Sequence, residues 1–322
     1  MFSPLSNDPS LRYSRGMQNI IILILIFLFV LWNVTLIGYD DKVTTPLEQD
    51  ETAVFSEKAK SILLKQESTK AILLIHGFPS TPSLYTYSAQ RFYDAGWDVH
   101  APLIPTFGSD PKEFENTTFS QWFDYICRYY ETMRKDYPTV HVLGTSMGGL
   151  MALKLGEKYC NTALEPDKLV TIAAPVVYNS IRDGIITSPI SYFMRTIALF
   201  STSIGAEPVD GNPKGDDGNE EWVGYNGQFV RSGLSLVHAM KEVRKNLGLI
   251  TCPLFSIQDV NDKTVPFGNL KIIQKENGSK SFRTLETHMG SFKHNRHALL
   301  LYHSIQEELT TTIIEFLNAE EK

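Results

Sequence analysis

The sequence predicts an α/β domain with a mostly parallel sheet, preceded by a single apolar helix at the N-terminus. Three observations support this prediction. They are a long apolar run near residue 25, short apolar runs that alternate with helical patterns from residue 70 onward, and an ordinary globular composition. The chain has 322 residues, of which 43% are hydrophobic and 20% charged. A single α/β domain of about 250 residues would use most of that length.

The apolar run near the N-terminus predicts a helix that spans a membrane. Residues Ile20 to Trp32 read IIILILIFLFVLW, and no charged residue occurs from Gly16 to Tyr39. At about 1.5 Å per residue, such a helix is long enough to cross a hydrocarbon core of about 30 Å. A core helix of a soluble domain is disfavoured, because an unbroken apolar run leaves no polar face for water. We therefore expect a transmembrane anchor over residues 17–39.

The charges on either side of this run predict its orientation. Arg12 and Arg15 precede it, whereas Asp40 and Asp41 follow it. Because positively charged flanks stay preferentially in the cytoplasm, residues 1–16 are predicted as a cytoplasmic tail and the rest of the chain as extracytoplasmic. A cleaved signal peptide is the alternative. It is disfavoured because the exit sequence NVTLIGYDD places bulky Leu and Ile side chains where a cleavage site needs small ones.

Composition and charge narrow the range of partners. The formal net charge is −6 and the pI is near 5.8, and no clustered basic face indicates a nucleic-acid partner. Cys127, Cys160 and Cys252 are widely spaced and do not form a metal-ligand pattern, so neither a metal nor another cofactor is expected. We expect three buried thiols, with a Cys127–Cys160 disulfide as the alternative in an extracytoplasmic domain.

Residues 40–69 are polar and are predicted as a spacer with one short helix that lifts the domain off the bilayer.

Short apolar runs bounded by turn residues predict strands that are buried on both faces. Such runs occupy Ala71–Ile75, Asp98–Leu103, Val140–Leu143, Leu169–Ala174, Leu254–Ile257 and Phe282–Leu285. Segments with helical periodicity occupy Phe119–Met133, Leu150–Tyr159 and Ala298–Leu317. Strands that alternate with helices imply right-handed crossovers and a mostly parallel sheet. Ligands bind at the carboxyl ends of the strands in such sheets, so functional residues are expected there.

A candidate nucleophile follows the strand that ends at Leu143. The loop reads Gly144-Thr145-Ser146-Met147-Gly148-Gly149, a G-x-S-x-G sequence between a strand and a helix. The turn is so tight that the serine takes a strained backbone conformation, and side chains two residues before and after it would collide. The strain lifts the Ser146 hydroxyl to a helix N-terminus, where the dipole favours a developing oxyanion. The flanking strand and helix favour this interpretation over a plain glycine turn.

Two backbone N–H groups are predicted to bind that oxyanion. One belongs to Met147, which directly follows the serine. The other belongs to Phe78 in the loop HGFPS after the first strand, where Gly77 allows a close approach of the backbone. His76 in the same loop is expected to be structural and to hold the loop by its ring nitrogens, with a role as the base as the alternative.

The motif predicts an acid and then a histidine, each after a later strand. Asp262 lies in a D-x-x-V-P sequence after the strand that ends at residue 257, whereas its rival Asp259 is expected to form the turn. His297 stands just before the predicted C-terminal helix and is favoured over His294 as the base. His303 is expected to be a partly exposed surface residue within that helix.

Four segments together resemble small bacterial carboxylesterases and monoacylglycerol lipases of the α/β-hydrolase fold. They read ILLIHGFPSTPS, GTSMGGLMALKLG, QDVNDKTVP and RHALLLYHS…IIEFL, and the likeness runs through most of residues 70–319. The resemblance implies an α/β-hydrolase domain over residues 70–322 with a small cap at about 176–237. It also implies Ser146, Asp262 and His297 as a catalytic triad, with Phe78 and Met147 as oxyanion donors. Two departures are a PTFGS sequence in place of the family's Gly-His-Gly turn, and the composition of the cap.

These residues predict a serine hydrolase that cleaves a carboxylic ester through an acyl-enzyme. The apolar first half of the cap, ISYFMRTIALFSTSIG, and the membrane helix favour a lipid-derived ester. The alternative is that this half packs over the core. Peptide, amide or thioester cleavage stays open, because the same triad serves these reactions. A non-catalytic membrane-anchored scaffold is disfavoured, because each catalytic position holds a competent residue.

Overall fold

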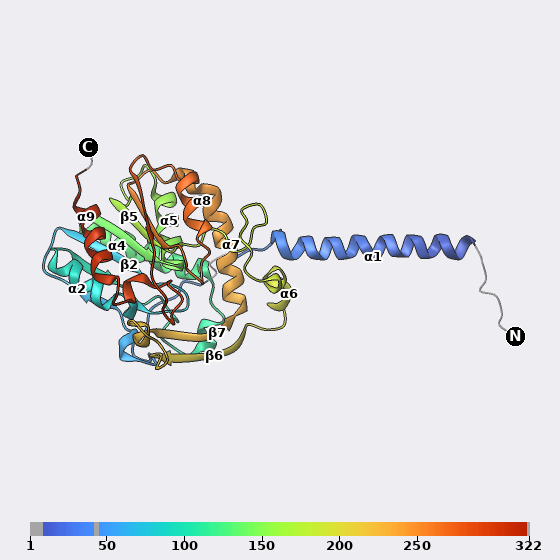
Figure 1. Cartoon of the computed structure of the whole chain (residues 1–322), viewed down its shortest axis with the longest axis horizontal. Coiled ribbons are helices and arrows are strands. Elements are labelled where there is room, and N and C mark those ends of the chain that lie inside the picture. Colours follow the sequence, from blue (N-terminus) through green and yellow to red (C-terminus); the bar gives the residue numbers. More distant parts are fainter. Residues whose placement is uncertain (1–8, 42–44, 321–322) are drawn as a thin grey trace.

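A seven-stranded sheet forms the centre of the protein. The structure is a computed structural model that describes residues 9–41 and 45–320 (Figure 1). The strand order is β1-β3-β2-β4-β5-β8-β9, and all neighbours pair in parallel except β1 and β3. The strands are β1 (Ile62–Leu64), β2 (Lys70–Ile75), β3 (Asp98–Ala101), β4 (Thr139–Thr145), β5 (Lys168–Ile172), β8 (Leu254–Asp259) and β9 (Phe282–Thr287). Every strand predicted from an apolar run is present, and the mostly parallel sheet is confirmed.

Helices cover both faces of this sheet. In β2, Ala71, Leu73 and Ile75 belong to the core on one face, and Ile72 and Leu74 belong to the core on the other. The first core also holds residues of α4 (Phe119–Asp136), α5 (Met147–Tyr159), α7 (Val230–Asn246) and α8 (Gly268–Glu276). The second holds residues of α2 (Thr86–Asp94) and α9 (Gln306–Asn318). Because both faces are covered, the strands read as unbroken apolar runs.

The helix predicted over Ala298–Leu317 is interrupted, so that prediction is wrong. The chain forms the short 3-10 helix η6 (Leu299–Leu301) and a turn before α9 begins at Gln306. In the turn, the His303 N–H donates to the backbone oxygen of Asp217, and Ser304 donates to the Asp217 carboxylate through both its N–H and its hydroxyl. A cap residue far away in sequence thus binds the donors of the turn. His303 lies outside a helix but is exposed, as expected.

The segment 40–69, predicted as a spacer, packs on the domain instead of standing free of it. It contains the 3-10 helix η1 (Glu57–Ala59) and β1, which extends the edge of the sheet next to β3. The Phe55 N–H donates to the Gly108 backbone oxygen at 2.8 Å, and the Ser61 hydroxyl donates to Glu51. The prediction of a free spacer is therefore wrong for the part of this segment that is described. Residues 42–44 lie outside the described residues.

An insertion between β5 and β8 forms the cap. It contains the 3-10 helix η3 (Pro189–Phe193), α6 (Met194–Ile197), β6 (Ser203–Asp210), the 3-10 helix η4 (Asn219–Glu221), β7 (Val223–Phe229) and α7. β6 and β7 form an antiparallel hairpin. This hairpin is joined to the loop after β2, because the Tyr225 N–H donates to the Pro79 backbone oxygen at 3.0 Å. The remaining short elements are η2 (Pro82–Tyr85), α3 (Pro111–Phe114) and η5 (Leu247–Leu249).

A long helix, α1 (Pro9–Thr35), projects from the domain (Figure 1). Its segment Gly16–Thr35 is long and apolar enough to cross a membrane, and almost all of it is exposed. By length and composition the helix is a candidate membrane span, and a signal sequence passes the same test. Of the predicted cytoplasmic tail over residues 1–16, residues 1–8 lie outside the described residues, and residues 9–16 belong to α1.

Candidate active site

Ser146 occupies a strained turn between β4 and α5. Its backbone has φ 56° and ψ −121°, which non-glycine residues rarely adopt. A Cβ atom added at Gly144 would lie 2.0 Å from the Gly148 backbone oxygen, and one added at Gly148 would lie 1.8 Å from the Ile75 backbone oxygen. Glycine is therefore required on both sides of the serine, as predicted. The Ser146 N–H donates to the Ile172 backbone oxygen at 2.7 Å, which fixes the turn to the neighbouring strand β5.

The loop after β2 approaches this serine closely. A Cβ atom added at Gly77 would lie 3.0 Å from the Ser146 Cβ and 3.7 Å from its Oγ. Within the described residues, neither the Phe78 N–H nor the Met147 N–H donates a hydrogen bond. Met147 is the first residue of α5, so its N–H is one of those left without a partner at a helix N-terminus. The two predicted oxyanion donors therefore keep their hydrogen-bonding capacity.

Asp262 and His297 are brought together as predicted. The Asp262 Oδ2 lies 2.8 Å from the His297 Nδ1, and the aspartate side chain is fully buried. The other oxygen of Asp262 accepts from the N–H groups of Thr264 at 2.8 Å and Val265 at 3.0 Å. A carboxylate held in this way fixes the orientation and the tautomer of the imidazole. His297 Nδ1 donates to Asp262, and Nε2 is left as the acceptor.

His297 Nε2 is buried and has no hydrogen-bond partner among the described residues. Ser146, with 8% of its surface exposed, is equally enclosed. The hydrogen bond between the acid and the imidazole of the predicted triad is thus present. The serine hydroxyl and the imidazole, both among the described residues, are not hydrogen-bonded to each other. A buried acceptor without a partner is rare and calls for an explanation, of which a catalytic role is one. Hydrogen bonds of this kind often form only when substrate is bound.

The loops that carry Asp262 and His297 are joined to each other directly. The Lys263 N–H donates to the Asn295 backbone oxygen at 3.0 Å, and the Asn295 amide donates to the Thr264 hydroxyl at 2.6 Å. The Tyr302 hydroxyl accepts from the His297 N–H at 3.3 Å and donates to Asn295 Oδ1 at 2.9 Å. Burial raises the pKa of Tyr302 to about 12, so the hydroxyl keeps its proton near neutral pH. No local sequence pattern indicated this role of Tyr302.

A second tyrosine that the sequence did not indicate lies under the serine turn. The buried Tyr85 hydroxyl lies 2.7 Å from the Ile75 backbone oxygen and 3.0 Å from the Thr145 hydroxyl. It thus connects the end of β2, which leads into the oxyanion loop, to the residue before Ser146. Burial raises the pKa of Tyr85 well above its usual value. Only the fold brings these three positions together, so no local pattern could have found them.

The rival acid and histidines have structural roles. Asp259 accepts from the Asn261 N–H at 2.8 Å, as expected of a turn former, and its other oxygen accepts from Thr287 and Met289 at the end of β9. His294 Nε2 lies 3.2 Å from Asp217 Oδ2, and its ring stacks on Tyr302 with centroids 3.7 Å apart. His294 therefore joins the cap to the C-terminal loops.

His76 holds the oxyanion loop by both ring nitrogens, as predicted. Its Nδ1 lies 3.1 Å from the Gly77 backbone oxygen, and its Nε2 accepts from the Ile104 N–H at 3.1 Å. Complete burial lowers the pKa of His76 to about 4. The imidazole is therefore neutral at neutral pH. Its Nε2 can then accept the hydrogen bond from the Ile104 N–H.

A cavity of about 550 Å³ opens between these loops and the cap hairpin. Phe78, Pro79 and His297 line one side, and Val209 and Asn226 of β6 and β7 are among the residues on the other. The oxyanion loop and the imidazole thus face a shared space large enough for a small organic substrate. None of the described residues that line it is acidic.

None of the three cysteines, all within the described residues, forms a disulfide, so the Cys127–Cys160 disulfide considered above is not formed. Cys127 and Cys252 are buried, as expected, whereas Cys160 is only partly buried. Within residues 9–41 and 45–320, no group of three or more His, Cys, Asp or Glu side chains is placed to hold a metal ion.

The sheet order, the strained serine turn after β4 and the inserted cap are those of an α/β hydrolase. The chain belongs to the family described as "Serine aminopeptidase, S33", whose sequence model matches residues 66–301. It is 29% identical to a thermostable monoacylglycerol lipase of Bacillus sp. (strain H-257) over 204 residues, which cover 63% of this chain and 74% of that protein. It is 24% identical to a carboxylesterase of Bacillus subtilis (strain 168) over 209 residues, which cover 64% of this chain and 78% of that protein.

Solved structures agree with this fold. A structure reported for the metagenome-derived lipolytic enzymes LipS and LipT superimposes with a TM-score of 0.67 at 19% identity. The match covers 81% of this chain and 98% of that one. The predicted α/β-hydrolase fold and the predicted resemblance to esterases and monoacylglycerol lipases are thereby confirmed.

Proposed function

We propose that the protein is a membrane-anchored serine hydrolase that cleaves carboxylic esters, with Ser146, His297 and Asp262 as its triad. The observation that carries this proposal is the buried Asp262–His297 pair, whose imidazole keeps one nitrogen without a partner. An acceptor in that state, next to a cavity shared with the oxyanion loop, is suited to take a proton from a hydroxyl nucleophile. The strained turn at Ser146 supplies that hydroxyl at a helix N-terminus.

The reaction proceeds in two halves. As the Ser146 Oγ forms a bond to the ester carbonyl carbon, its proton moves to His297 Nε2, and the Phe78 and Met147 N–H groups bind the oxyanion. The carbon–oxygen bond to the alcohol then breaks, and the alcohol leaves with the proton from His297. In the second half a water molecule gives its proton to His297 and attacks the acyl-enzyme, which releases the carboxylic acid and regenerates Ser146. Asp262 stabilises the imidazolium in both halves.

The cavity favours an ester over an N-terminal peptide. An aminopeptidase must hold the free, positively charged α-amino group of its substrate, and an acidic side chain is the usual means. The described lining of the cavity offers none, and its charged side chain is instead Lys214. The names of the similar proteins, a monoacylglycerol lipase and a carboxylesterase, agree with an ester.

A lipid-derived ester is the substrate class that we favour. In the first half of the cap, η3 and α6 bury none of their residues, which leaves apolar side chains there partly exposed. A candidate membrane span precedes the domain, and Arg12 and Arg15 before it favour an extracytoplasmic position of the domain. A monoacylglycerol or another medium-chain ester at the outer surface of the membrane therefore fits both the apolar part of the cap and the candidate membrane span.

The test is the turnover of p-nitrophenyl esters from acetate to octanoate by the full chain and by Ser146→Ala. Ser201→Ala, which changes a cap serine away from the triad, serves as the matched control. We expect Ser146→Ala to lose turnover of every ester and Ser201→Ala to retain it, with faster turnover of octanoate than of acetate. Turnover that survives in Ser146→Ala contradicts the triad. Turnover of an aminoacyl p-nitroanilide in preference to all esters contradicts the ester assignment.

A further inference from the structure

The stretch 181–200 of the cap exposes several large apolar side chains. Ile181, Ile186, Ile190, Leu199 and Phe200 are 62–85% exposed. We call these five residues the apolar face. Soluble surfaces seldom expose so many large apolar groups close together in sequence, and contiguous patches of this kind mark contacts with another protein or with a membrane.

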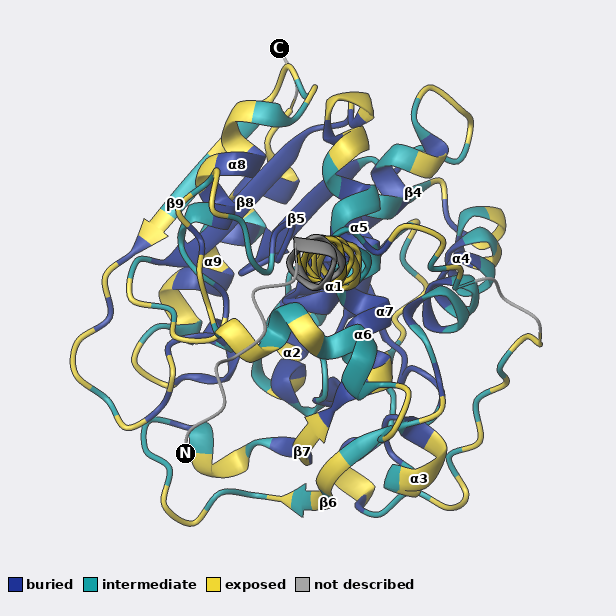
Figure 2. Ribbon diagram, turned by 90° about the vertical axis from the view of Figure 1, so that its right-hand side faces the viewer, coloured by how far each residue is buried: buried dark blue, intermediate teal, exposed yellow. Residues whose placement is uncertain are grey.

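Elements of the stretch 181–200, which carries the apolar face, contact the root of α1. The cap elements η3 and α6, which lie within this stretch of sequence, both contact α1. The Phe193 ring of η3 stacks on the Phe29 ring of α1, with centroids 6.3 Å apart. Figure 2 looks along α1 onto the side of the domain from which the helix emerges, and it shows α6 beside the helix. The apolar face and the candidate membrane span therefore lie on the same side of the molecule.

Specific polar contacts clamp α1 to the cap. The Asn33 Oδ1 accepts from the Thr196 N–H at 3.0 Å and from the Thr196 hydroxyl at 2.9 Å. The Arg195 guanidinium lies 4.1 Å from the centroid of the Trp32 ring, and its Nη1 donates to the Trp32 backbone oxygen at 3.0 Å. Cations at the last carbonyl groups of a helix satisfy acceptors that the helix itself leaves open.

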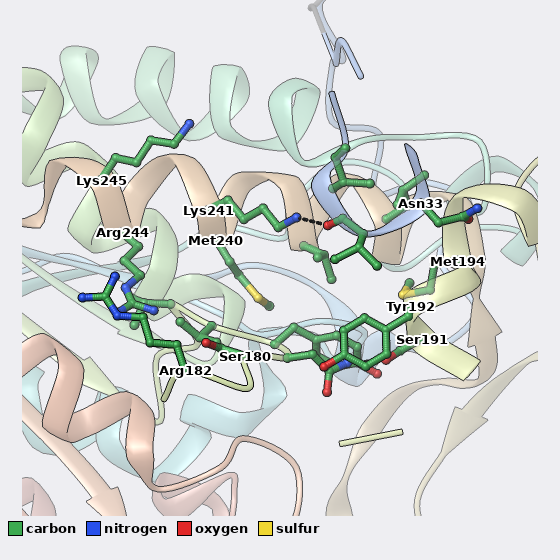
Figure 3. Close-up of a pocket in the computed structure, with 18 of the residues that line it drawn as sticks. Asn33, Ser180, Arg182, Ser191, Tyr192, Met194, Met240, Lys241, Arg244 and Lys245 are labelled. Atoms are coloured by element: carbon green, nitrogen blue, oxygen red, sulfur yellow. Dashed lines mark hydrogen bonds between the residues drawn. The ribbon is translucent and has the colours of Figure 1, made fainter. Parts of the chain in front are cut away.

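A second cation completes this clamp from α7. The Lys241 Nζ donates to the Val34 backbone oxygen at 2.7 Å, at the mouth of a cavity of about 580 Å³ between α1, α7 and the cap (Figure 3). Two elements of the domain, α6 and α7, thus hold the last turn of α1, and η3 contacts the turn before it. A helix held in this way fixes the orientation of the domain relative to a membrane that the helix crosses, which a flexible tether would leave free.

We infer that the apolar face is a docking surface for the phospholipid bilayer, and that the clamp on α1 holds the cap flat against the outer leaflet. This inference rests on the proposed membrane anchor. α1 projects away from the side of the domain that carries the face (Figures 1 and 2), so a bilayer crossed by α1 must lie against that side. Trp32 with Arg195 has the chemistry of an interfacial anchor, and the apolar side chains around it reach the boundary between headgroups and acyl chains. The cap that borders the proposed active site would then meet lipid esters where they are packed.

The test measures membrane contact at three positions of the full chain in phosphatidylcholine nanodiscs. An environment-sensitive fluorophore is attached to Phe200→Cys in the apolar face, to Leu25→Cys within α1, or to Leu63→Cys in β1, each in a Cys160→Ser background. β1 contacts α2, which lies on the far side of the domain from α1 (Figure 1). Quenching by lipids that carry a nitroxide on the headgroup or deep in the acyl chain then reports the contact and its depth.

We expect deep quenching at position 25, shallow quenching at position 200 and none at position 63. If position 25 is quenched while position 200 is no more quenched than position 63, the docking surface is overturned and the anchor stays intact. The absence of quenching at 25 overturns the anchor itself. A spectral shift at position 200 that grows with the number of protein copies per disc, without quenching by lipid, identifies a second copy of the chain as the occupant and also overturns the inference.

A kinetic readout supplements the fluorescence. Phe200→Ser and Leu199→Ser together should slow hydrolysis of a monoacylglycerol presented in vesicles by about tenfold, because weaker docking lowers the local concentration of the cap at the lipid surface. Hydrolysis of dissolved p-nitrophenyl acetate should stay unchanged, since neither residue contacts the described catalytic loops. Equal rates on vesicles for the double variant and the parent contradict the docking surface.

Discussion

The loops at the carboxyl edge of the sheet and the first half of the cap differ in how they are held. At the sheet edge Asp262 is fully buried and accepts hydrogen bonds from two backbone N–H groups as well as contacting His297. In the cap, η3 and α6 bury no residue; η3 contacts α1, and α6 contacts both α7 and α1. The Asp262–His297 pair is thus held by the domain itself, whereas η3 and α6 are held in part by α1, the candidate membrane span.

The largest effect expected on the sheet-edge side is that of Asp262→Asn. The amide keeps the shape of the side chain but favours the wrong tautomer of His297, so kcat should fall by about 10⁴-fold with little change in KM. Asp259→Asn is the matched control, because Asp259 binds backbone and threonine groups and not the imidazole. Steady-state kinetics on one p-nitrophenyl ester distinguish the two. A larger loss of kcat in Asp259→Asn would transfer the role of the acid to that residue.

A glycine pair tests how tightly the serine turn is built. Gly148→Ala places a Cβ atom 1.8 Å from the Ile75 backbone oxygen, so the free energy of unfolding should fall by about 3 kcal/mol or more. In contrast, Gly233→Ala in α7 meets only the flexible end of Met194 at 3.3 Å, and alanine is the better helix former by about 1 kcal/mol. Denaturant unfolding in detergent measures both. A Gly148→Ala protein as stable as the parent would contradict the packing described for the turn.

Acid should loosen the oxyanion loop through His76. Its folded pKa of about 4 lies below its unfolded value of about 6.5, so the unfolded chain binds more protons between these pH values. Stability should therefore fall as the pH drops from 6.5 towards 4, by at most about 3 kcal/mol for this residue. Glu157 acts in the opposite direction, because burial raises its pKa to about 8.

Comparison of variants isolates the contribution of His76. His76→Gln should flatten the fall in unfolding free energy between pH 7 and pH 5, whereas substitution of the exposed His303 by Gln should leave the pH dependence unchanged. An identical pH dependence for His76→Gln and the parent would show that burial does not hold this imidazole neutral.

The smallest effect is expected at the clamp between α1 and the cap. Thr196→Val removes one hydrogen bond to Asn33 and should weaken the contact by about 1 kcal/mol. Amide hydrogen exchange of the α6 segment should accelerate by about fivefold, while exchange in β4 stays unchanged. Thr312→Val, which removes only a local bond within α9, is the control. Unaltered exchange in α6 would mean that the hydroxyl does not hold the cap.

The strands and the serine turn could be predicted from the sequence because local physics determines them. A strand covered on both faces needs an unbroken apolar run, and the turn at Ser146 admits only glycine at 144 and 148. Asp262 and His297 could be placed because each follows a strand of a parallel sheet, where all carboxyl ends meet. Asp259 could be separated from Asp262 because an aspartate directly at a strand end tends to bind its own turn.

Contacts between distant segments could not be predicted. The break in the C-terminal helix depends on Asp217, a cap residue that binds His303 and Ser304. Tyr85 and Tyr302 acquire their roles only through the fold, and their neighbours in sequence give no hint of them. The polar segment 40–69 carries too short an apolar run at β1 to reveal that it joins the sheet. The contacts of η3 and α6 with α1 likewise join segments that are distant in sequence.

The proposed function requires that the hydroxyl of Ser146 is the nucleophile and that His297 activates it. The most direct measurement is labelling of the full chain with a fluorophosphonate, followed by mass spectrometry of the proteolytic peptides. We expect one adduct, on Ser146, that is lost in Ser146→Ala and forms much more slowly in His297→Ala but not in His294→Ala. An adduct on another serine, or labelling of Ser146 that proceeds at the parental rate without His297, would contradict it.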